Sequence, residues 1–421
     1  MQRISVIGSY KTVLFLTDEE TFIYTSTRYG MTLVGAVDWE DKKFVEKVLS
    51  VIDKKCGKRP LVVLNDMSEQ FYKVDKIPPV WSPLDRSNIV KRKLSAAFPQ
   101  YTIRNALLQE EKQAGTKTKN YKAILAAIPS SQKIQKINNV LSFSGLQILN
   151  FGLLPVESSS MVKALSQSLS KTPKGVTNWT VFIAQNANGG LRQIVTKNGN
   201  MALTRLTPIV NTDEEPEVWA SEVSQELKAT MTYLTRFDYR QDDNLEIIVI
   251  SSPTSGQILE GLIEVSCNFY SLTVLQAQER LKLQVKDAAE SKYADPLHAR
   301  WAAEKLSFDM DLKSDDIKKV ANSRFGAVAA SCVFAITLVY FISAALFTYN
   351  SLSETKTNLV QAKAERTQAQ ATYDKAANNS KISEYPVNLL KGAVQVYEEF
   401  DRAEIKPIDY INRISKASTR F

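Results

Sequence analysis

A long uncharged segment near the C-terminal end constrains this chain more than any other sequence feature. Between Arg324 and Glu354 lie 29 residues without one charged side chain. Their central part, Ala327–Phe347, supplies 21 predominantly apolar residues. About 20 such residues let a helix cross the hydrocarbon core of a bilayer. We therefore expect one transmembrane helix over 325–349; the alternative is a buried helix in a soluble core.

The charges that flank this segment predict its orientation. Four basic side chains precede it and three follow it, the latter interleaved with acids: Lys313, Lys318, Lys319 and Arg324, then Lys356, Lys363 and Arg366. Positive charge is enriched on the cytoplasmic side of membrane proteins. We expect a cytoplasmic N-terminal region, residues 294–324 as a linker before the membrane, and an exported C-terminal segment.

The exported segment is rich in Ala, Gln, Lys and Glu, and it lacks Pro and Gly up to residue 380. Residues spaced alternately by three and four predict a coiled-coil helix over 350–380; they are Leu352, Thr355, Leu359, Ala362, Arg366, Ala369, Tyr373 and Ala376. The alternative is a lone solvated helix. Residues 381–421 are expected to be helical, and they either begin a longer domain or dock on a partner.

Composition excludes several classes of protein. The net charge of +8 is spread along the chain without polybasic runs, which argues against nucleic-acid binding. The three cysteines, Cys56, Cys267 and Cys332, are too widely spaced to predict a disulfide framework or a zinc site. The chain has one histidine, His298, so we expect no metal centre that needs several imidazoles.

Residues 1–293 alternate between apolar runs typical of strands and amphipathic runs typical of helices, which predicts an α/β domain. The expected strands are 2–7, 12–16, 20–25, 31–37, 59–65, 122–130 and 146–155, and the expected helices are 41–54, 131–145 and 157–170. A basic helix is also expected around Lys91, Arg92 and Lys93.

A second copy of the opening pattern begins at Asn178. WTVFIAQNANGGLRQIVTKNGNMALTRLTPI predicts three strands joined by tight turns, because Asn-Gly between alternating apolar runs is a strong hairpin signal. A helix (217–236), a strand (245–252) and another helix (255–267) are expected to follow. Two such openings predict an internally duplicated fold.

The order of these elements resembles the actin-like ATPase fold, and specifically the PilM and GspL proteins of type IV pilus and type II secretion machines. The resemblance covers roughly residues 1–275 and rests on two stretches, KAILAAIPSSQKIQKINNVLSFSGLQILNFGLLPVESSSMVKAL and SEVSQELKATMTYLTRF…LEIIVISSPTSGQILEGLIEVSC. It implies a duplicated actin-like cytoplasmic domain. The expected membrane helix and coiled coil follow this domain, as they do in GspL-like proteins. The same order would result from a fusion of PilM with its single-span partner PilN.

The resemblance also implies where a nucleotide would bind. In the family pattern the first strand ends in Asp-Ile-Gly, and this chain has Val6-Ile7-Gly8 followed by Ser9. The second loop has Phe182-Ile183-Ala184, and the third contains Pro253, which removes a backbone donor. We expect no ATP hydrolysis, no metal site and no catalytic residues. ATP remains the one candidate cofactor, at vestigial loops formed by Gly8, Ser9, Lys11, Thr12 and Gly256.

The resemblance predicts a scaffold of a bacterial inner membrane, with its N-terminus cytoplasmic and its C-terminus periplasmic. Its cytoplasmic domain would recruit the assembly ATPase of a pilus or secretion machine. Its exported helix would pair with itself or with sister single-span proteins. Two alternatives remain: a membrane-anchored actin-like ATPase or nucleotide-gated assembly factor, and a membrane-anchored filament-forming protein.

Overall fold

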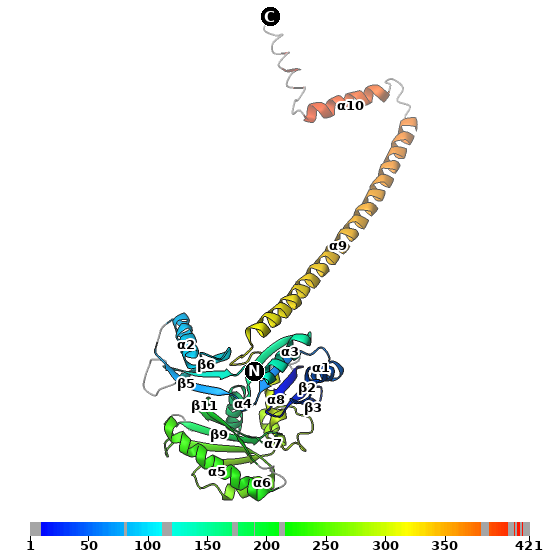
Figure 1. Cartoon of the computed structure of the whole chain (residues 1–421). Helices are drawn as coiled ribbons and strands as arrows, with labels where there is room; N and C mark the ends of the chain where they lie inside the picture. The colour runs from blue at the N-terminus through cyan, green and yellow to red at the C-terminus, as the bar shows by residue number, and fades with distance from the viewer. Residues whose placement is uncertain are drawn as a thin grey trace. The chain divides into compact units, whose positions relative to one another are not determined.

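A computed structural model describes most of the chain (Figure 1): residues 10–79, 82–111, 120–170, 176–188, 190–209, 215–379, 387–402, 408, 411–412 and 415. The chain separates into two compact units, Met1–Ala330 and Ser331–Phe421. The first unit contains all the described strands, and the second is helical.

The first half of the first unit is built on a five-stranded sheet. Its strands, in the order β3-β2-β1-β4-β8, are β1 (Thr12–Leu16), β2 (Glu20–Thr27), β3 (Gly30–Asp38), β4 (Leu61–Asn65) and β8 (Ile148–Leu153). The first three form an antiparallel meander, while β4 lies parallel to both β1 and β8. The sequence of β1, TVLFL, is buried throughout, as a central strand covered on both faces requires.

The second half repeats this design. Its strands, in the order β11-β10-β9-β12-β13, are β9 (Asn178–Gln185), β10 (Gly190–Lys197), β11 (Asn200–Pro208), β12 (Asn244–Ile250) and β13 (Asn268–Leu272). Asn198 and Gly199 both have positive φ, 53° and 77°, which is what a type I′ hairpin turn needs. The repeated strand order confirms the predicted duplication, and the fold is actin-like.

A smaller sheet is inserted after β4. It contains β5 (Phe71–Ile77), β6 (Ile103–Glu111) and β7 (Asn120–Ile128) in the order β5-β7-β6, and α2 (Pro83–Ala97) covers one face. Ser82 caps α2 by accepting from the backbone N–H of Asp85, and Pro83 occupies the first turn, where it costs no hydrogen bond. The predicted basic helix is therefore confirmed.

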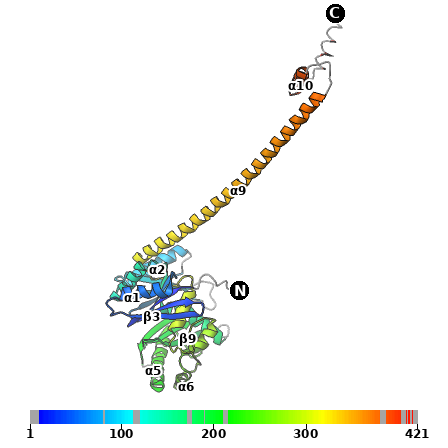
Figure 2. The same ribbon diagram turned by 90° about the vertical axis from the view of Figure 1, so that its right-hand side faces the viewer.

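Helices cover the outer faces of the two large sheets and fill the space between them (Figure 2). They are α1 (Phe44–Val51), α3 (Gln132–Phe143), α4 (Leu154–Leu169), α5 (Pro216–Leu234), α6 (Pro253–Gly261), α7 (Val274–Leu281) and α8 (Asp295–Glu304). One hydrophobic cluster joins Phe15 of β1, Leu165 of α4, Phe182 of β9 and Leu297 of α8. Helices α4 and α8 therefore lie between the two sheets.

Two predicted elements differ from the structure, and strands β5, β6 and β13 were not predicted. The helix expected over 41–54 is α1 followed by a π-helical turn, Ile52–Cys56. The helix expected over 255–267 ends at Gly261, and the chain continues into β13. Strand β13, NFYSL, was missed because five residues carry too little periodicity to separate strand from loop. The strand predicted over 2–7 lies outside the described residues.

The segment expected as a linker, 294–324, is packed into the first unit. Helix α8 forms within it, and Leu312 donates its backbone N–H to the carbonyl of Phe151 in β8 at 2.6 Å. The N–H of Phe151 in turn donates to Oδ1 of Asp311 at 3.0 Å. The polar composition of this stretch concealed its few inward-facing apolar side chains, among them Met310 and Ile317.

A buried carboxylate also holds this segment. Glu157 of α4 is fully buried, and it accepts the backbone N–H of Met310 at 2.9 Å and the ammonium of Lys305 at 2.8 Å. Burial raises the pKa of Glu157, while Lys305 acts in the opposite direction. The chain therefore enters its long helix from a firmly bonded position.

Helix α9 (Asp315–Asn379) begins in the first unit and continues into the second, which also contains α10 (Val387–Arg402). Within Ala330–Asn378 one window is long and apolar enough to cross a membrane, and its side chains are not buried. The heptad residues Leu352, Leu359 and Tyr373 are exposed. Their pairing with another helix stays a prediction.

Candidate functional site

The carboxyl ends of the central strands bring polar loops from both halves together. Strand β1 leads into the turn 17–19 and β4 into Asp66, both in the first half. Strand β9 leads into Asn186 and its turn, in the second half. In a duplicated fold this meeting point of the two halves is where a ligand would be held, so we treat it as the candidate site.

The first hairpin turn among the described residues follows β1. Leu16 pairs with Thr21, so the turn between the first two described strands is 17–19. Gly8 and Ser9, the predicted turn, lie outside the described residues. Both ISVIG and TVLFL are short apolar runs, and periodicity cannot decide which of them opens the meander.

The other predicted site residues are not brought together at this meeting point. Lys11 and Thr12 lie at the start of β1, at the opposite end of the strand from its turn. Lys11 is buried, and its ammonium donates to the carbonyl of Lys305. Gly256 lies inside α6, and a Cβ added there would meet Oγ of Ser271 at 1.9 Å. Its role in the structure is close packing between α6 and β13.

A buried ion pair joins the two halves instead. Arg192 of β10 and Asp66 are both almost fully buried, and Nη2 of Arg192 lies 2.6 Å from Oδ1 of Asp66. The Nε–H of Arg192 donates to the same carboxylate oxygen at 2.7 Å. Asn186 donates its amide to the other oxygen, Oδ2, at 3.1 Å. The carboxylate is therefore bonded on both oxygens, which offsets the cost of burying the charges.

Helix α8 contributes two more buried groups next to this pair. Asp295 accepts the backbone N–H of Ala187 at 2.9 Å; burial, with a further contribution from Asp66, raises the pKa of Asp295 to about 8. Burial lowers the pKa of His298 to about 3, so its imidazole is neutral at physiological pH. Oγ of Ser158 lies 2.8 Å from Nδ1 of His298. We call Asp66, Asn186, Arg192, Asp295 and His298 the polar cluster.

The side chains of the polar cluster fill the space between them. The gap they line with Leu154 and Ala184 is too small to admit a water molecule. Ser158 and His298 are therefore shielded from solvent, and no carboxylate among the described residues hydrogen-bonds the imidazole. A nucleophile needs access to substrate and a base held by a third group, so this pair lacks the features of a catalytic site.

The two hairpin turns also touch each other directly. Asn188 donates its amide to Glu19 at 3.3 Å and to Glu20 at 3.2 Å. With Asp18 these acids give the first turn three consecutive negative charges. Such a turn repels a phosphate rather than binding it, because a phosphate site needs backbone N–H groups or cations directed at the anion.

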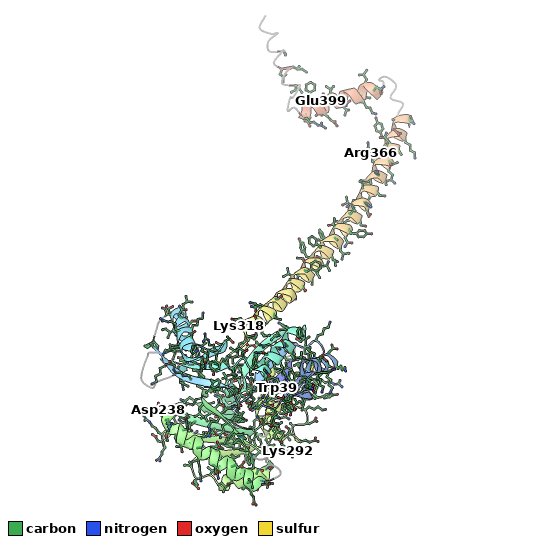
Figure 3. The ribbon with its side chains drawn as sticks, in the orientation of Figure 1. Trp39, Asp238, Lys292, Lys318, Arg366 and Glu399 are labelled. Atoms are coloured by element: carbon green, nitrogen blue, oxygen red, sulfur yellow. The ribbon has the colours of Figure 1, made fainter. Side chains whose placement is uncertain are left out.

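An open groove of about 540 Å³ lies beside the site, within the first half; Figure 3 labels Trp39, one of its lining residues. Its wall is formed by Asp18, Trp39, Glu40, Met67, Ser68, Glu69, Ser131, Gln132, Lys133 and Lys136. The two lysines donate to backbone carbonyls of Asp18 and Trp39. Both ammonium groups are therefore engaged in holding α3 against the strand ends.

Sequence reasoning missed most of the polar cluster. A usable signal for Asp66 existed, because LVVLND ends a buried strand with two polar residues. Arg192 gave none, since an arginine in a hairpin is normally exposed. His298 stands in a stretch of polar composition, and the structure buries it. In the described part of the chain no group of His, Cys, Asp or Glu is placed to hold a metal ion.

No protein-family model and no curated protein matches the sequence. Solved structures do match. A structure described as a PilM-PilN type IV pilus biogenesis complex aligns with 71% of this chain and 99% of its own, with a TM-score of 0.50 and 9% identity. At that identity the match shows the shared fold.

Two further structures align with TM-scores of 0.36. One is a protein of unknown function with an actin-like ATPase fold from Bacteroides thetaiotaomicron (7% identity, 67% of this chain and 98% of that one). The other is the cytoplasmic domain of EpsL, an inner membrane component of the type II secretion system of Vibrio cholerae (10% identity, 68% and 97%). At that score neither adds to the fold assignment.

Proposed function

We propose that this protein is a membrane-anchored scaffold of a type IV pilus or type II secretion machine. The observation that carries the proposal is one chain that combines an actin-like unit, similar in fold to the PilM-PilN structure, with a helix apolar enough to span a membrane. The scaffold would lie in a bacterial inner membrane with its N-terminus in the cytoplasm and its C-terminus in the periplasm.

We propose further that the actin-like unit acts without hydrolysing a nucleotide. The contacts that support this are the Asp66–Arg192 ion pair, the acidic turn 17–19 and the amide of Asn188 bonded across to Glu19. Together they bond the two halves to each other where a nucleotide would have to enter. A triphosphate would have to break a buried ion pair and displace acidic side chains, and both steps cost binding energy.

The partners we propose are the cytoplasmic assembly ATPase and sister single-span membrane proteins. The firmly bonded segment between α8 and α9 supports a role in transmitting contacts, because a flexible linker would lose them. The exposed heptad residues of α9 support pairing with a second copy or with a sister protein.

The proposal is tested with the full chain purified in detergent and mixed with a cytoplasmic assembly ATPase of a type IV pilus or type II secretion machine. We expect a stable complex by size-exclusion chromatography with light scattering, and no phosphate release from ATP by this chain alone. Thermal unfolding in millimolar Mg-ATP gives a second test. A bound ligand at 100 times its Kd would add about 2.7 kcal/mol and raise the midpoint by several degrees. We expect no shift; a clear shift would show that the unit binds ATP, and intrinsic hydrolysis would contradict the proposal that it acts without hydrolysing a nucleotide.

A further inference from the structure

The exposed face of α2 carries cations that the fold does not use. Lys91 and Arg92 are exposed, and neither makes a hydrogen bond or an ion pair with any described residue. The neighbouring basic side chains are engaged: Lys93 bonds to Asp75 at 2.9 Å, and the guanidinium of Arg86 stacks over a ring, that of Tyr121. One side of α2 is therefore packed and the other is free and positive.

Strand β5 extends this positive surface. Lys73 and Lys76 are exposed on β5, and Lys73 likewise has no partner among the described residues. Taken together, β5 and α2 carry six basic side chains and two acidic ones, the acids being Asp75 and Asp85. We call Lys73, Lys91 and Arg92 the basic face. Half of the chain's net charge of +8 is thus concentrated on two elements of the inserted sheet.

Helix α2, which carries Lys91 and Arg92 of the basic face, lies at the end of the first unit from which α9 starts. Both views place α2 and the first turns of α9 at this end, and α5 and α6 at the other (Figures 1 and 2). A contact agrees with this arrangement, because Asn105 of β6 donates its amide to the carbonyl of Asp311 at 2.6 Å. The inserted sheet is thus bonded to a residue four positions before α9 begins.

The position of α9 in the sequence limits how far this end can lie from a bilayer. Lys318, labelled in Figure 3, lies in the first turn of α9, and the apolar window begins at or after Ala330. At 1.5 Å per residue the helix between them covers roughly 18 Å. A cytoplasmic bilayer surface with anionic lipids attracts basic side chains within about a Debye length, near 8 Å in physiological salt.

We propose that the basic face of α2 and β5 binds the anionic headgroups of the membrane that α9 crosses. The bound surface would fix the orientation of the actin-like unit on the bilayer. This inference rests on the proposed membrane span, and it adds a second, electrostatic contact to it. A lipid surface fits better than an acidic protein, because the cations are free and because Lys91 and Arg92 lie at the end of the first unit where α9 starts.

The test uses the full chain in lipid nanodiscs with a photoreactive benzoylphenylalanine in place of Asn88, which lies on the same face of α2 as Lys91 and Arg92. The nanodiscs contain either phosphatidylcholine alone or about one third phosphatidylglycerol. We expect lipid adducts at position 88 in the anionic discs, and few in neutral discs or at high salt. The matched control places the probe at Val218, exposed on α5, where we expect no lipid adduct.

Charge reversal sharpens the test. Each basic residue near an anionic surface contributes about a fivefold gain in binding, so Lys91→Glu/Arg92→Glu should lower adduct formation roughly 25-fold or more. Lys228→Glu/Arg240→Glu changes the net charge equally at the α5 end and should leave it unchanged. Because Lys91 and Arg92 have no described partners, the variant should keep the circular dichroism of the parent chain.

The outcomes separate the two proposals. A chain that fails to enter the nanodiscs contradicts the membrane span and with it the proposed function. A chain that enters, but whose probe at position 88 labels no lipid, or labels neutral and anionic lipid equally, overturns this inference alone. Adducts with an acidic protein instead of lipid, formed in native membranes, would overturn it as well.

Discussion

The two halves of the actin-like unit share one strand order but differ in what their loops contribute. In the first half the turn after β1 and the end of β4 supply acids, Asp18, Glu19 and Asp66. In the second half the turn after β9 and strand β10 supply amides and a guanidinium, Asn186 and Arg192. The charges of the two halves are therefore complementary, and the two halves are bonded to each other where their strand ends meet.

The halves also differ in what is attached to them. The first half holds the inserted sheet between β4 and β8 and bonds to residues 311 and 312 before α9. In the second half, β12 leads directly through α6 to β13. The first half thus carries the inserted sheet and the bonds to the segment before α9, and the second half supplies the groups that neutralise and cover its acidic strand ends. Four substitutions test this division.

The largest effect is expected from Arg192→Ala. The change leaves the buried Asp66 carboxylate without its cation, which costs about 3–5 kcal/mol of stability. Denaturant titration of the full chain in detergent, followed by tryptophan fluorescence, measures it. The double variant Asp66→Ala/Arg192→Ala should recover part of the loss. If Arg192→Ala costs under about 1 kcal/mol, the ion pair does not hold the halves together.

The second test is the pH dependence of Asp295→Asn. The pKa of Asp295 is raised to about 8, so the folded chain keeps a proton that the unfolded chain releases near pH 4. Wild-type stability from this group is complete below pH 4 and is lost as the pH rises toward 8. The asparagine side chain of the variant has no proton to lose and can still accept from the backbone N–H of Ala187.

Relative to the wild type, the free energy of unfolding of the variant should therefore rise by up to about 1.4 kcal/mol per pH unit between pH 5 and 8. His298 is neutral in the folded chain over this range, and its protonation in the unfolded chain near pH 6.5 affects wild type and variant equally. Melting curves at four pH values between these limits measure the slope. If the stabilities of the two proteins change with pH by the same amount, Asp295 is already ionised in the folded chain.

A third, smaller effect is expected from Gly256→Ala. The new Cβ would lie 1.9 Å from Oγ of Ser271, and such overpacking costs about 1–3 kcal/mol. Gly261→Ala, in the same helix with open space at its Cβ, is the control and should be neutral or stabilising. Ser271→Gly should rescue Gly256→Ala if packing is the reason for the glycine, and it should not if the glycine serves a nucleotide.

The smallest effect is expected from Asn188→Ala, which removes the amide shared by Glu19 and Glu20. These groups are partly exposed, so the loss should be about 0.5–1 kcal/mol. Asn188→Asp should cost more at low salt and recover in high salt, because it adds a third carboxylate that counterions screen. A salt-independent loss for Asn188→Asp would show that charge is not what matters between the turns.

Regular features of this fold could be predicted from the sequence. The duplication was visible because each meander alternates apolar strands with tight turns, and Asn198-Gly199 specifies its hairpin locally. The basic helix around Lys91, Arg92 and Lys93 was predicted, but its start at Ser82 and Pro83 was not. The candidate membrane span needed only a count of uncharged residues. Each of these depends on neighbours within about 20 positions, which a sequence displays directly.

The site was much harder to predict. Asp66 and Arg192 are 126 positions apart, and neither carries a local signal that it will be buried. We expected Gly256 in a nucleotide loop. In the structure Gly256 of α6 packs closely against Ser271 of β13, and this contact accounts for the glycine. The predicted turn at Gly8 and Ser9 lies outside the described residues, and the first described hairpin turn is 17–19.

By itself, then, the sequence determined the α/β class, the repeated meander, the capped helices and the apolar segment, since period, turn chemistry and hydropathy act over short distances. Only the tertiary structure decided that residues 305–312 bond to β8 and α4 instead of forming a linker, and that the acids of one half meet the arginine of the other. Burial and charge pairing depend on which distant elements the fold brings into contact, and no local pattern encodes that choice.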